Sequence, residues 1–407
     1  MRILVTGGAG FIGANFVRYW LEEHPDDHVV VYDLLTYAGN RASLADLEER
    51  IGFVEGDIAD PDTVARALAD EEIDTVVNFA AESHNSLAVL DPGRFFRTNV
   101  LGTQTLLEAA RAAGIGRFHH VSTCEVYGDL ALDSGEAFTE ESPYRPRTPY
   151  NASKAGADHA VRAYFETYGL PVTITNCANN YGPYQFPEKV IPLFTTNALD
   201  DEALPLYAST ENRREWLHAL DHCHAIDLVL RDGRVGETYN VGSRFEASIE
   251  ELADRILALL DKPGSLKTIV PDRPGHDRRY LLDASKIERD LGWRPSVDFD
   301  RGLEETVRWY ADNRAWWSRS SGARRSRRLP GARGAPHTPR ASRGSARRLS
   351  PIGARRGAPR RRRTPERSGP PWGSAIRDRR ACPEAPIHSG DGCGREGGAT
   401  SSRGPRS

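Results

Sequence analysis

Short apolar runs alternate with amphipathic stretches through the first half of the chain. The apolar runs are rich in β-branched residues and predict buried strands at Ile3–Thr6, Val29–Tyr32, Phe53–Glu55, Thr75–Phe79, Arg117–Ser122 and Pro171–Asn176. The stretches between them predict helices at Phe11–Glu23, Pro61–Ala69, Thr98–Ala113 and Ala152–Tyr168. Such alternation is typical of an α/β fold, so we expect a doubly wound parallel sheet.

The second half of the chain is less regular and richer in Pro, Asn and Gly. Predicted helices at Ser248–Leu260 and Arg301–Asn313 indicate a smaller α/β lobe. We expect this lobe to pack at the carboxyl edge of the sheet, where open α/β folds bind their ligands. The predicted organisation is a Rossmann-like domain at residues 1–175, to which later segments return, and a mainly substrate-binding lobe at residues 176–317.

The last 90 residues, 318–407, have a different composition. They hold 23 Arg, no Lys and 5 acidic residues, so the chain totals of 54 basic and 57 acidic leave 31 and 52 for residues 1–317. Gly, Ala, Arg, Pro and Ser make up 72 of the 90 without hydrophobic periodicity, which predicts a disordered tail. These residue types have G/C-rich codons, and our hypothesis is an out-of-frame reading of a G/C-rich gene. The alternatives are a polyanion-binding module and an inert extension; nucleic-acid binding is disfavoured because Trp372 is the tail's one aromatic residue.

Neither a membrane span nor a covalent or metal scaffold is indicated. No apolar run approaches the roughly 20 residues that cross a bilayer, and no basic, apolar leader precedes the first predicted strand. The five cysteines lack metal-ligand spacing and do not form a disulfide framework. We therefore expect a cytoplasmic protein without a metal.

A glycine-rich turn follows the first predicted strand. In Gly7-Gly8-Ala9-Gly10-Phe11-Ile12-Gly13, Gly7 permits the tight turn, Gly10 the approach of a pyrophosphate, and Gly13 close packing of helix on sheet. Asp33 ends the second strand, where a carboxylate accepts both ribose hydroxyls and repels a 2′-phosphate. Asp57 and Ile58 follow the third strand, where an adenine edge would lie. The pattern predicts NAD as the cofactor.

Tyr150 and Lys154 are spaced by one helical turn, so both project from one helix face. We expect the ammonium to lower the pKa of the phenol, which lets the tyrosine act as a base near neutral pH. A surface Tyr/Lys pair is the alternative in isolation. The dinucleotide turn, together with Ser122-Thr123 at a strand end, favours a catalytic pair.

These features resemble the extended short-chain dehydrogenase/reductase superfamily and, within it, the dTDP-glucose 4,6-dehydratases. The resemblance runs from Arg2 to about Trp317. It rests on segments that begin at Ala80 (AAESH), Glu125 (EVYG), Asn179 (NNYGP), Phe186 (FPEK), Arg214 (REWLH) and Asp272 (DRPGHDRRY).

The resemblance implies an internal redox cycle that ends with NAD unchanged. Tyr150, assisted by Thr123 and Lys154, removes the proton of the sugar 4-hydroxyl while hydride leaves C4. Glu125 then removes the acidified C5 proton, water leaves from C6, and hydride returns to C6. The product is a 4-keto-6-deoxy sugar. Related C4 epimerases need Ser/Thr, Tyr and Lys but no carboxylate, so Glu125 is the residue that indicates dehydration.

The resemblance also implies the residues of each site. The catalytic residues are Thr123, Cys124, Glu125, Tyr150 and Lys154. The cofactor-binding residues are Gly7, Gly10, Phe11, Ile12, Gly13, Asp33, Asp57, Ile58, Ala80, Ala81, Thr98, Tyr150, Lys154 and Asn180. The substrate-binding residues are Ser83, Thr123, Asn179, Lys189, Val190, Pro205, Tyr207, Arg214, Asn240, Arg273 and His276. The substrate is a nucleotide-diphosphate hexose, and relatives pair through two long helices, here Thr98–Ala113 and Ala152–Tyr168, which implies a homodimer.

Two departures from the family pattern affect the chemistry. Cys124 replaces the aspartate that serves as general acid; a thiol, with an ordinary pKa of about 8.5, is protonated at neutral pH, so Cys124 could still donate a proton. The alternative is a passive cysteine with water as the acid. Asn85-Ser86-Leu87-Ala88 replaces Val-Asp-Arg-Ser, which removes an acid–base pair beside the expected hexose pocket. A 5,6-dehydratase and a UDP-sugar 4,6-dehydratase therefore stay open as alternatives.

Overall fold

The computed structural model describes residues 1–318 of the 407-residue chain, and these residues fall within one compact unit. Its centre is a seven-stranded parallel sheet in the order β10-β6-β5-β4-β1-β2-β3. The strands are β1 (Arg2–Thr6), β2 (His28–Asp33), β3 (Ile51–Glu55), β4 (Thr75–Asn78), β5 (Arg117–Thr123), β6 (Val172–Cys177) and β10 (Thr238–Val241). Strand order reverses beside β1, which creates the crevice at which such sheets bind ligands.

Alternate side chains of the central strands enter two separate cores. Leu4 of β1 packs into the core on one face, whereas its neighbours Ile3 and Val5 pack into the core on the other. In β2, Val30 packs into the same core as Leu4, and Val31 packs into the same core as Ile3 and Val5. Because both faces are buried, the strands read as continuous apolar runs, and this explains why the sequence located them.

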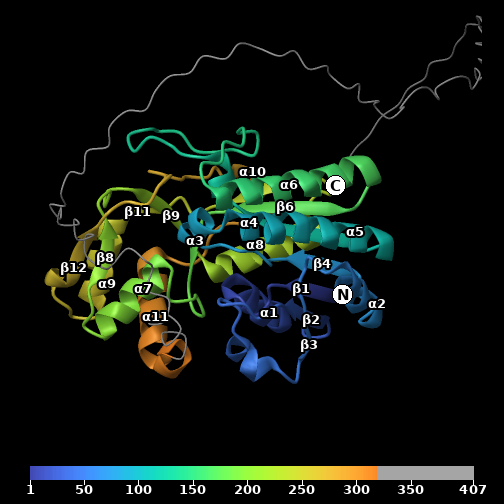
Figure 1. Ribbon diagram of the computed structural model, residues 1–407, viewed down its shortest axis with the longest axis horizontal. Helices are drawn as coiled ribbons and strands as arrows, with labels where there is room; N and C mark the ends of the chain where they lie inside the picture. The colour runs from blue at the N-terminus through green and yellow to red at the C-terminus, as the bar shows by residue number, and fades with distance from the viewer. Residues whose placement is uncertain (319–407) are drawn as a thin grey trace, which may run out of the picture. The chain divides into compact units, whose positions relative to one another are not determined.

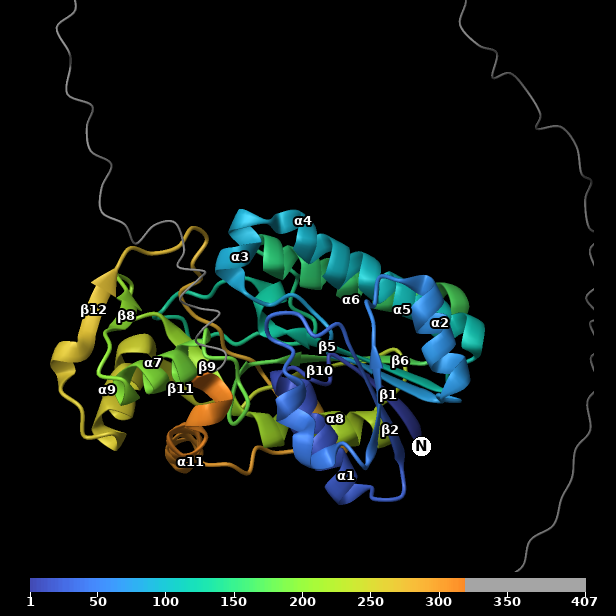
Figure 2. The ribbon, with the colours of Figure 1, turned by 60° about the horizontal axis from the view of Figure 1, so that its bottom comes forward.

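Helices cover both faces of the sheet, as Figure 2 shows. α2 (Pro61–Asp70), α5 (Thr103–Ala113) and α6 (Pro149–Tyr168) lie on one side, and α1 (Phe11–Glu23) and α8 (Ala219–Asp232) on the other. α6 begins three residues before its predicted start, because Thr148 accepts a hydrogen bond from the amide of Asn151 and Pro149 occupies the first turn. It ends at Gly169, whose φ of +69° closes the helix in the left-handed conformation.

The smaller lobe lies beside the carboxyl edge of the large sheet (Figure 1). It contains a three-stranded sheet in the order β11-β9-β7 and a parallel pair, β12-β8. These strands are β7 (Asn179–Tyr181), β8 (Leu204–Tyr207), β9 (Arg213–His218), β11 (Glu246–Ser248) and β12 (Lys267–Val270). Its helices are α7 (Val190–Leu199), α9 (Ile249–Leu259) and α11 (Phe299–Asp312), which share one apolar core. A capping box between Ser248 and Glu251 fixes the start of α9.

Short segments complete the described chain. They are η1 (Arg41–Leu47), α3 (Asn85–Leu90), α4 (Pro92–Phe95), η2 (Phe96–Gly102), η3 (Cys124–Tyr127), η4 (Gly264–Leu266) and α10 (Ser285–Leu291). The prediction of one α-helix at Thr98–Ala113 was wrong in its first turn, since η2 is a π-helical segment that runs into α5. Gly102 packs against Ile58, and a Cβ there would lie 2.7 Å from the Ile58 side chain. Such wide turns are frequent at functional sites.

The two lobes interleave along the chain. β10 joins the large sheet beside β6, and α8 packs on α1, so segments beyond residue 175 do return to the first lobe. Within residues 1–318 no helix is long and apolar enough to cross a membrane. The predictions for the basic tail concern residues outside the described part of the chain, apart from Ser318.

Candidate active site

A cleft with a cavity volume of about 300 Å³ opens at the carboxyl ends of the central strands. Every residue predicted to bind the cofactor lines it. These are Gly7, Gly10, Phe11, Ile12, Gly13, Asp33, Asp57, Ile58, Ala80, Ala81, Thr98, Tyr150, Lys154 and Asn180. The structure therefore brings together residues that are up to 173 positions apart in sequence, from Gly7 to Asn180.

The glycine-rich turn is so tight that a side chain would not fit at two of its positions. Gly7 has a φ of +68°, and a Cβ on it would lie 2.7 Å from the backbone nitrogen of Ala80. A Cβ on Gly13 would lie 2.3 Å from the carbonyl oxygen of Gly7. The turn thus presents the amides at the start of α1 to the cleft, which is the arrangement that holds a pyrophosphate.

Asp33 is the last residue of β2, and its carboxylate is buried at the edge of the cleft. One oxygen accepts a hydrogen bond from the amide of Ala9 (3.0 Å), the other from the amide of Leu35 (2.8 Å). Burial raises the pKa of Asp33, and these two hydrogen bonds oppose that shift. Each carboxylate oxygen has a second acceptor site, so two ribose hydroxyls fit alongside the amides.

Four of the predicted catalytic residues share this cleft. Thr123 ends β5, Glu125 lies in η3, and Tyr150 and Lys154 lie one turn apart on α6. The predicted face of α6 is therefore confirmed. The Nζ of Lys154 donates to the carbonyl oxygen of Val121 (2.8 Å).

The structure does not meet the expectation that Lys154 lowers the pKa of Tyr150. Burial raises the pKa of Tyr150 well above its ordinary value, and the negative charge of Glu125 raises it further. A hydrogen bond with Thr123 opposes the shift. The spacing placed the ammonium on the predicted helix face, but spacing carries no information on burial, which is the first cause of the raised pKa of Tyr150.

Lys154 belongs to a buried polar cluster that the sequence reasoning missed. His120 Nε2 lies 3.3 Å from its Nζ and 3.4 Å from a carboxylate oxygen of Asp158. Ser122 donates to the other Asp158 oxygen (2.8 Å). Burial lowers the pKa of Lys154, and the charge of Asp158 opposes that effect. Asp158 lies four residues after Lys154, so the helical repeat could have identified it as a partner on the same face.

Cys124 lies beneath the cleft rather than on its wall. Its side chain is 1% exposed and packs in an apolar cluster with Val126, Ala155 and Cys177. Burial, followed by the charge of Glu125, raises the pKa of the Cys124 thiol well above its ordinary value. The thiol thus keeps its proton, as expected, but within residues 1–318 Cys124 is not among the residues that line the cleft.

The predicted substrate residues form two groups. Ser83, Thr123, Asn179 and Lys189 line the cleft itself. Asn179 Oδ1 and Arg273 Nη1 are buried without a hydrogen-bond partner among the described residues, as expected of groups that face a ligand.

A cationic region adjoins this part of the cleft. Burial and the charges of Lys189 and Arg273 lower the pKa of His84 to about 4. Burial and the charges of Arg214 and Arg273 likewise lower the pKa of His276 to about 4. Such a concentration of positive charge suits a diphosphate.

The remaining substrate residues lie farther from the cleft. Val190 begins α7, and Pro205 and Tyr207 lie on β8, where the Tyr207 ring packs against the His276 ring at 5.0 Å. Arg214 is buried and donates to the carbonyl oxygens of Arg213, Asp277 and Arg278. Asn240 is fully buried, and its side chain bonds Phe138 and Tyr127. The structure does not bring Asn240 to the cleft.

Among residues 1–318 no cluster of His, Cys, Asp and Glu could hold a metal ion.

Comparisons with known proteins agree with this arrangement. The profile of the family described as GDP-mannose 4,6 dehydratase matches residues 4–306. The dTDP-glucose 4,6-dehydratase of Mycobacterium tuberculosis is 50% identical over 318 residues, which cover 78% of this chain and 95% of that protein. The chain belongs to the dTDP-glucose 4,6-dehydratase family.

Solved structures of the family lead to the same conclusion. The crystal structure of the dTDP-glucose 4,6-dehydratase DesIV of Streptomyces venezuelae, with NAD and TYD bound, is 54% identical with a TM-score of 0.76. The match covers 79% of this chain and 100% of the DesIV chain. A UDP-glucose 4-epimerase of Thermotoga maritima, solved with UDP-glucose, is 28% identical with a TM-score of 0.72, and covers 77% of this chain and 99% of that one. The dehydratases are thus the closer relatives of these two groups.

Proposed function

We propose that this protein converts dTDP-glucose into dTDP-4-keto-6-deoxyglucose and water, with NAD as a bound cofactor that is regenerated in each turnover. The observation that carries the proposal is the presence of Glu125 in one cleft with Thr123, Tyr150 and Lys154. Epimerisation at C4 needs no base beside the ketone, whereas loss of water from C5 and C6 needs one. The identity of 50% with curated dTDP-glucose 4,6-dehydratases supports the same reaction.

The described residues fit NAD. Gly7, Gly10 and Gly13 would hold the pyrophosphate, Asp33 the adenosine ribose, and Lys154 the nicotinamide ribose. The carboxylate of Asp33 also disfavours a 2′-phosphate at that ribose. The chemistry that NAD supplies when bound is reversible hydride transfer, out of sugar C4 and into C6.

Tyr150 is the base for the sugar 4-hydroxyl. Its pKa is raised by burial, so the phenol holds its proton until a positive charge stabilises the phenolate. Lys154 is the buried cation on the same helix face, and the carboxylate of Asp158 favours its charged form. Thr123 hydrogen-bonds Tyr150 and thereby orients the phenolic oxygen.

Glu125 is the base for the C5 proton. Its amide donates to Thr123 Oγ1 (3.3 Å), which ties η3 to the end of β5. The diphosphate of the substrate would lie against Lys189, Arg273 and His276, which leaves the hexose at the Glu125 end of the cleft. The role of Cys124 as the acid for the departing 6-hydroxyl stays a prediction, because the thiol lies beneath the cleft and η3 would have to shift for it to reach the sugar.

A homodimer is part of the proposal. α5 and α6 pack side by side, and apolar residues beside them are exposed: Phe96 (43%), Leu101 (58%) and Tyr168 (56%). Pairing of two copies through these helices would cover them. Sedimentation velocity should give a dimer, and Leu101→Arg should give a monomer.

We also assign the protein to the cytoplasm, since Cys124, Cys177 and Cys223 are free thiols.

The test of the reaction uses the full chain with dTDP-glucose in deuterated water. We expect a 4-keto product, detected by its alkali-induced absorbance, with deuterium at C5 in its mass spectrum. Glu125→Gln should abolish dehydration while NAD stays bound, and Glu49→Gln, at an exposed glutamate, should behave as wild type. Undiminished dehydration by Glu125→Gln would refute the proposal, as would a product without deuterium at C5.

A further inference from the structure

Asn85, the first residue of α3, contacts the side chain of Glu125. Its Nδ2 donates to Glu125 Oε2 at 3.1 Å, and both residues are partly buried. A carboxylate only accepts hydrogen bonds, so it pairs with the NH₂ end of the amide and not with its oxygen. The contact therefore holds one oxygen of Glu125 in place, and Oε1, the oxygen outside this contact, is the better placed to take a proton.

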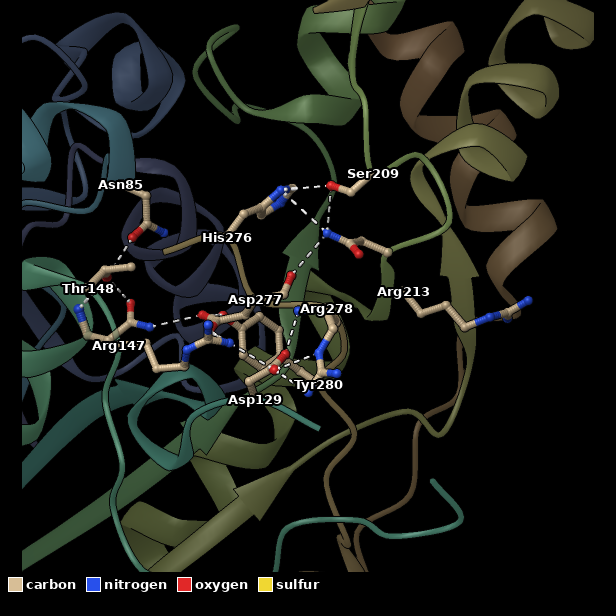
Figure 3. A network of polar contacts seen from close by, with 12 residues as sticks. Asn85, Asp129, Arg147, Thr148, Ser209, Arg213, His276, Asp277, Arg278 and Tyr280 are labelled. Carbon is tan, nitrogen blue, oxygen red and sulfur yellow. Dashed lines mark hydrogen bonds and ion pairs between the residues drawn. The ribbon is translucent and has the colours of Figure 1, made fainter. Parts of the chain in front are cut away.

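The orientation of the Asn85 amide is fixed from its other end. Thr148 Oγ1 lies 3.0 Å from Asn85 Oδ1, and its one hydroxyl proton is shared between this oxygen and Asn151 Oδ1. The same hydroxyl lies 2.7 Å from Asn151 Oδ1 and accepts from the Asn151 amide at 3.2 Å. Figure 3 shows Asn85 and Thr148 meeting in this way. Because Thr148 is the N-cap of α6, the support for Asn85 comes from the helix that carries Tyr150.

The chain of contacts continues to a fully buried carboxylate. Asn151 Nδ2 lies 3.3 Å from Asp277 Oδ2, which also accepts from the Tyr280 hydroxyl. Arg147 lies 3.2 Å from the other Asp277 oxygen and 2.8 Å from Asp129. Figure 3 draws Arg147 beside both carboxylates. Burial raises the pKa of Asp277, and the charge of Glu125 raises it further. The network thus connects Glu125 to a fully buried carboxyl group that Arg147 contacts.

Local folding does not account for the side chain of Asn85. The amide of Leu87 in the first turn of α3 is capped by His84 Nδ1 at 3.3 Å. Both polar ends of Asn85 are instead directed to Glu125 and Thr148. An isolated role as a helix cap is therefore excluded by the observed partners.

We propose that Asn85 is the positioning residue for Glu125 in the elimination step, an inference that rests on the proposed dehydration. In that step the C5–H bond breaks, an O–H bond forms on Glu125, and the electron pair moves toward the 4-keto oxygen. The N–H of Asn85 stabilises the ionised carboxylate, which is the form that accepts the proton. Asn85 also keeps the free oxygen directed at the hexose rather than at solvent.

The experiment compares Asn85→Ala and Asn85→Asp with Val89→Ala, an exposed residue of the same helix. A hydrogen bond to a charged group corresponds to about a 10-fold to 100-fold effect, so we expect Asn85→Ala to lower kcat by at least about 10-fold with KM unchanged. The acid limb of the pH profile should move up by about one pH unit. Asn85→Asp is nearly isosteric and should move the limb further, because it places a second carboxylate against Glu125.

Two readouts distinguish positioning from a structural effect. The isotope effect with substrate deuterated at C5 should rise in Asn85→Ala, because proton removal becomes slower, while the effect with deuterium at C4 falls. In protein free of cofactor and substrate, the ¹³C signal of the Glu125 carboxyl, assigned by its loss in Glu125→Gln, should titrate at higher pH in Asn85→Ala than in wild type.

The outcomes are separable from those of the proposed function. A wild-type kcat and acid limb in Asn85→Ala overturn the inference, and so does a fall in kcat without a change in the pH profile or the C5 isotope effect. If wild type does not dehydrate dTDP-glucose, the proposed function fails. The carboxyl titration then still decides whether Asn85 stabilises the ionised form of Glu125, and an unchanged titration overturns that.

Discussion

Glu215 should make the stability of this protein depend on pH in a direction opposite to that of an ordinary carboxylate. It lies on β9 with no exposed surface, and its two oxygens accept from the amides of Arg244 (2.6 Å) and Leu282 (2.9 Å). Burial raises the pKa of Glu215 from 4.5 to about 7 despite these hydrogen bonds, and the charge of Glu246 adds to the effect.

The sign follows from which state binds the proton more tightly. Between pH 4.5 and about 7 the folded protein holds a proton on Glu215 that the unfolded chain has lost, so a rise in pH favours unfolding. The contribution is fully present below pH 4.5 and is lost as the pH rises through about 7. At about 1.36 kcal/mol per pH unit this interval corresponds to about 3 kcal/mol of unfolding free energy.

The assay is urea unfolding followed by tryptophan fluorescence, for wild type and Glu215→Gln, from about pH 5 to about pH 8. The variant cannot titrate, so the wild-type unfolding free energy minus that of the variant should fall by about 2.5 kcal/mol between pH 5 and pH 8. Other groups titrate in both proteins and cancel in the difference. Glu49→Gln, at an exposed glutamate, should give a difference that does not change with pH. A flat difference for Glu215→Gln would refute the reasoning.

Three further outcomes are expected. Gly13→Ala places a Cβ 2.3 Å from the Gly7 carbonyl oxygen. The resulting overpacking, which costs about 1–3 kcal/mol, should lower the affinity for NAD about 10-fold or more. The assay heats the purified variant and measures the NAD that is released, and an undiminished amount would contradict this prediction. Cys124→Ala should lower turnover by up to about 100-fold, which is the lower end of the effect that a general acid has, and Cys124→Asp should restore turnover. Full turnover by Cys124→Ala would show that Cys124 is not the acid. Arg273→Ala removes a buried, unpartnered donor and should weaken dTDP binding by about 10-fold to 100-fold in calorimetry, whereas unchanged affinity argues against a diphosphate contact.

The sequence predicted the large sheet well because its strands are buried on both faces. The six predicted strands all exist, and Phe11–Glu23 is a helix with the predicted bounds. The seventh strand, β10 (Thr238–Val241), was missed because two of its four residues, Thr238 and Asn240, are polar, so it lacks the apolar run of the other strands. The π-helical turn in η2 was missed because it depends on the packing of Gly102 against Ile58, a contact remote in sequence.

The gathering of the predicted cofactor residues in one cleft was predictable for a related reason. They follow strands or begin helices, and the ends of parallel strands converge at one edge. The residues that would position a catalytic side chain, such as Asn85 beside Glu125, were not predictable in this way. Asn85 meets Glu125 across 40 positions and Asn151 meets Asp277 across 126, and no local pattern reports such contacts. The pKa of Tyr150 was likewise misjudged, because burial is a property of the assembled fold.

The return of β10 to the large sheet has a consequence for synthesis on the ribosome. Residues that line the cofactor cleft all precede Val190, but β6 remains an open edge until Val241 has emerged, and α1 lacks its cover until α8 has been made. The nascent first lobe therefore exposes the edge of β6 and the apolar face of α1 during the interval between the synthesis of Cys177 and that of Val241. This interval spans roughly 60 residues and lasts a few seconds or more at typical elongation rates. We expect this interval to be the stage at which chaperones engage the chain and at which a pause in translation is most damaging.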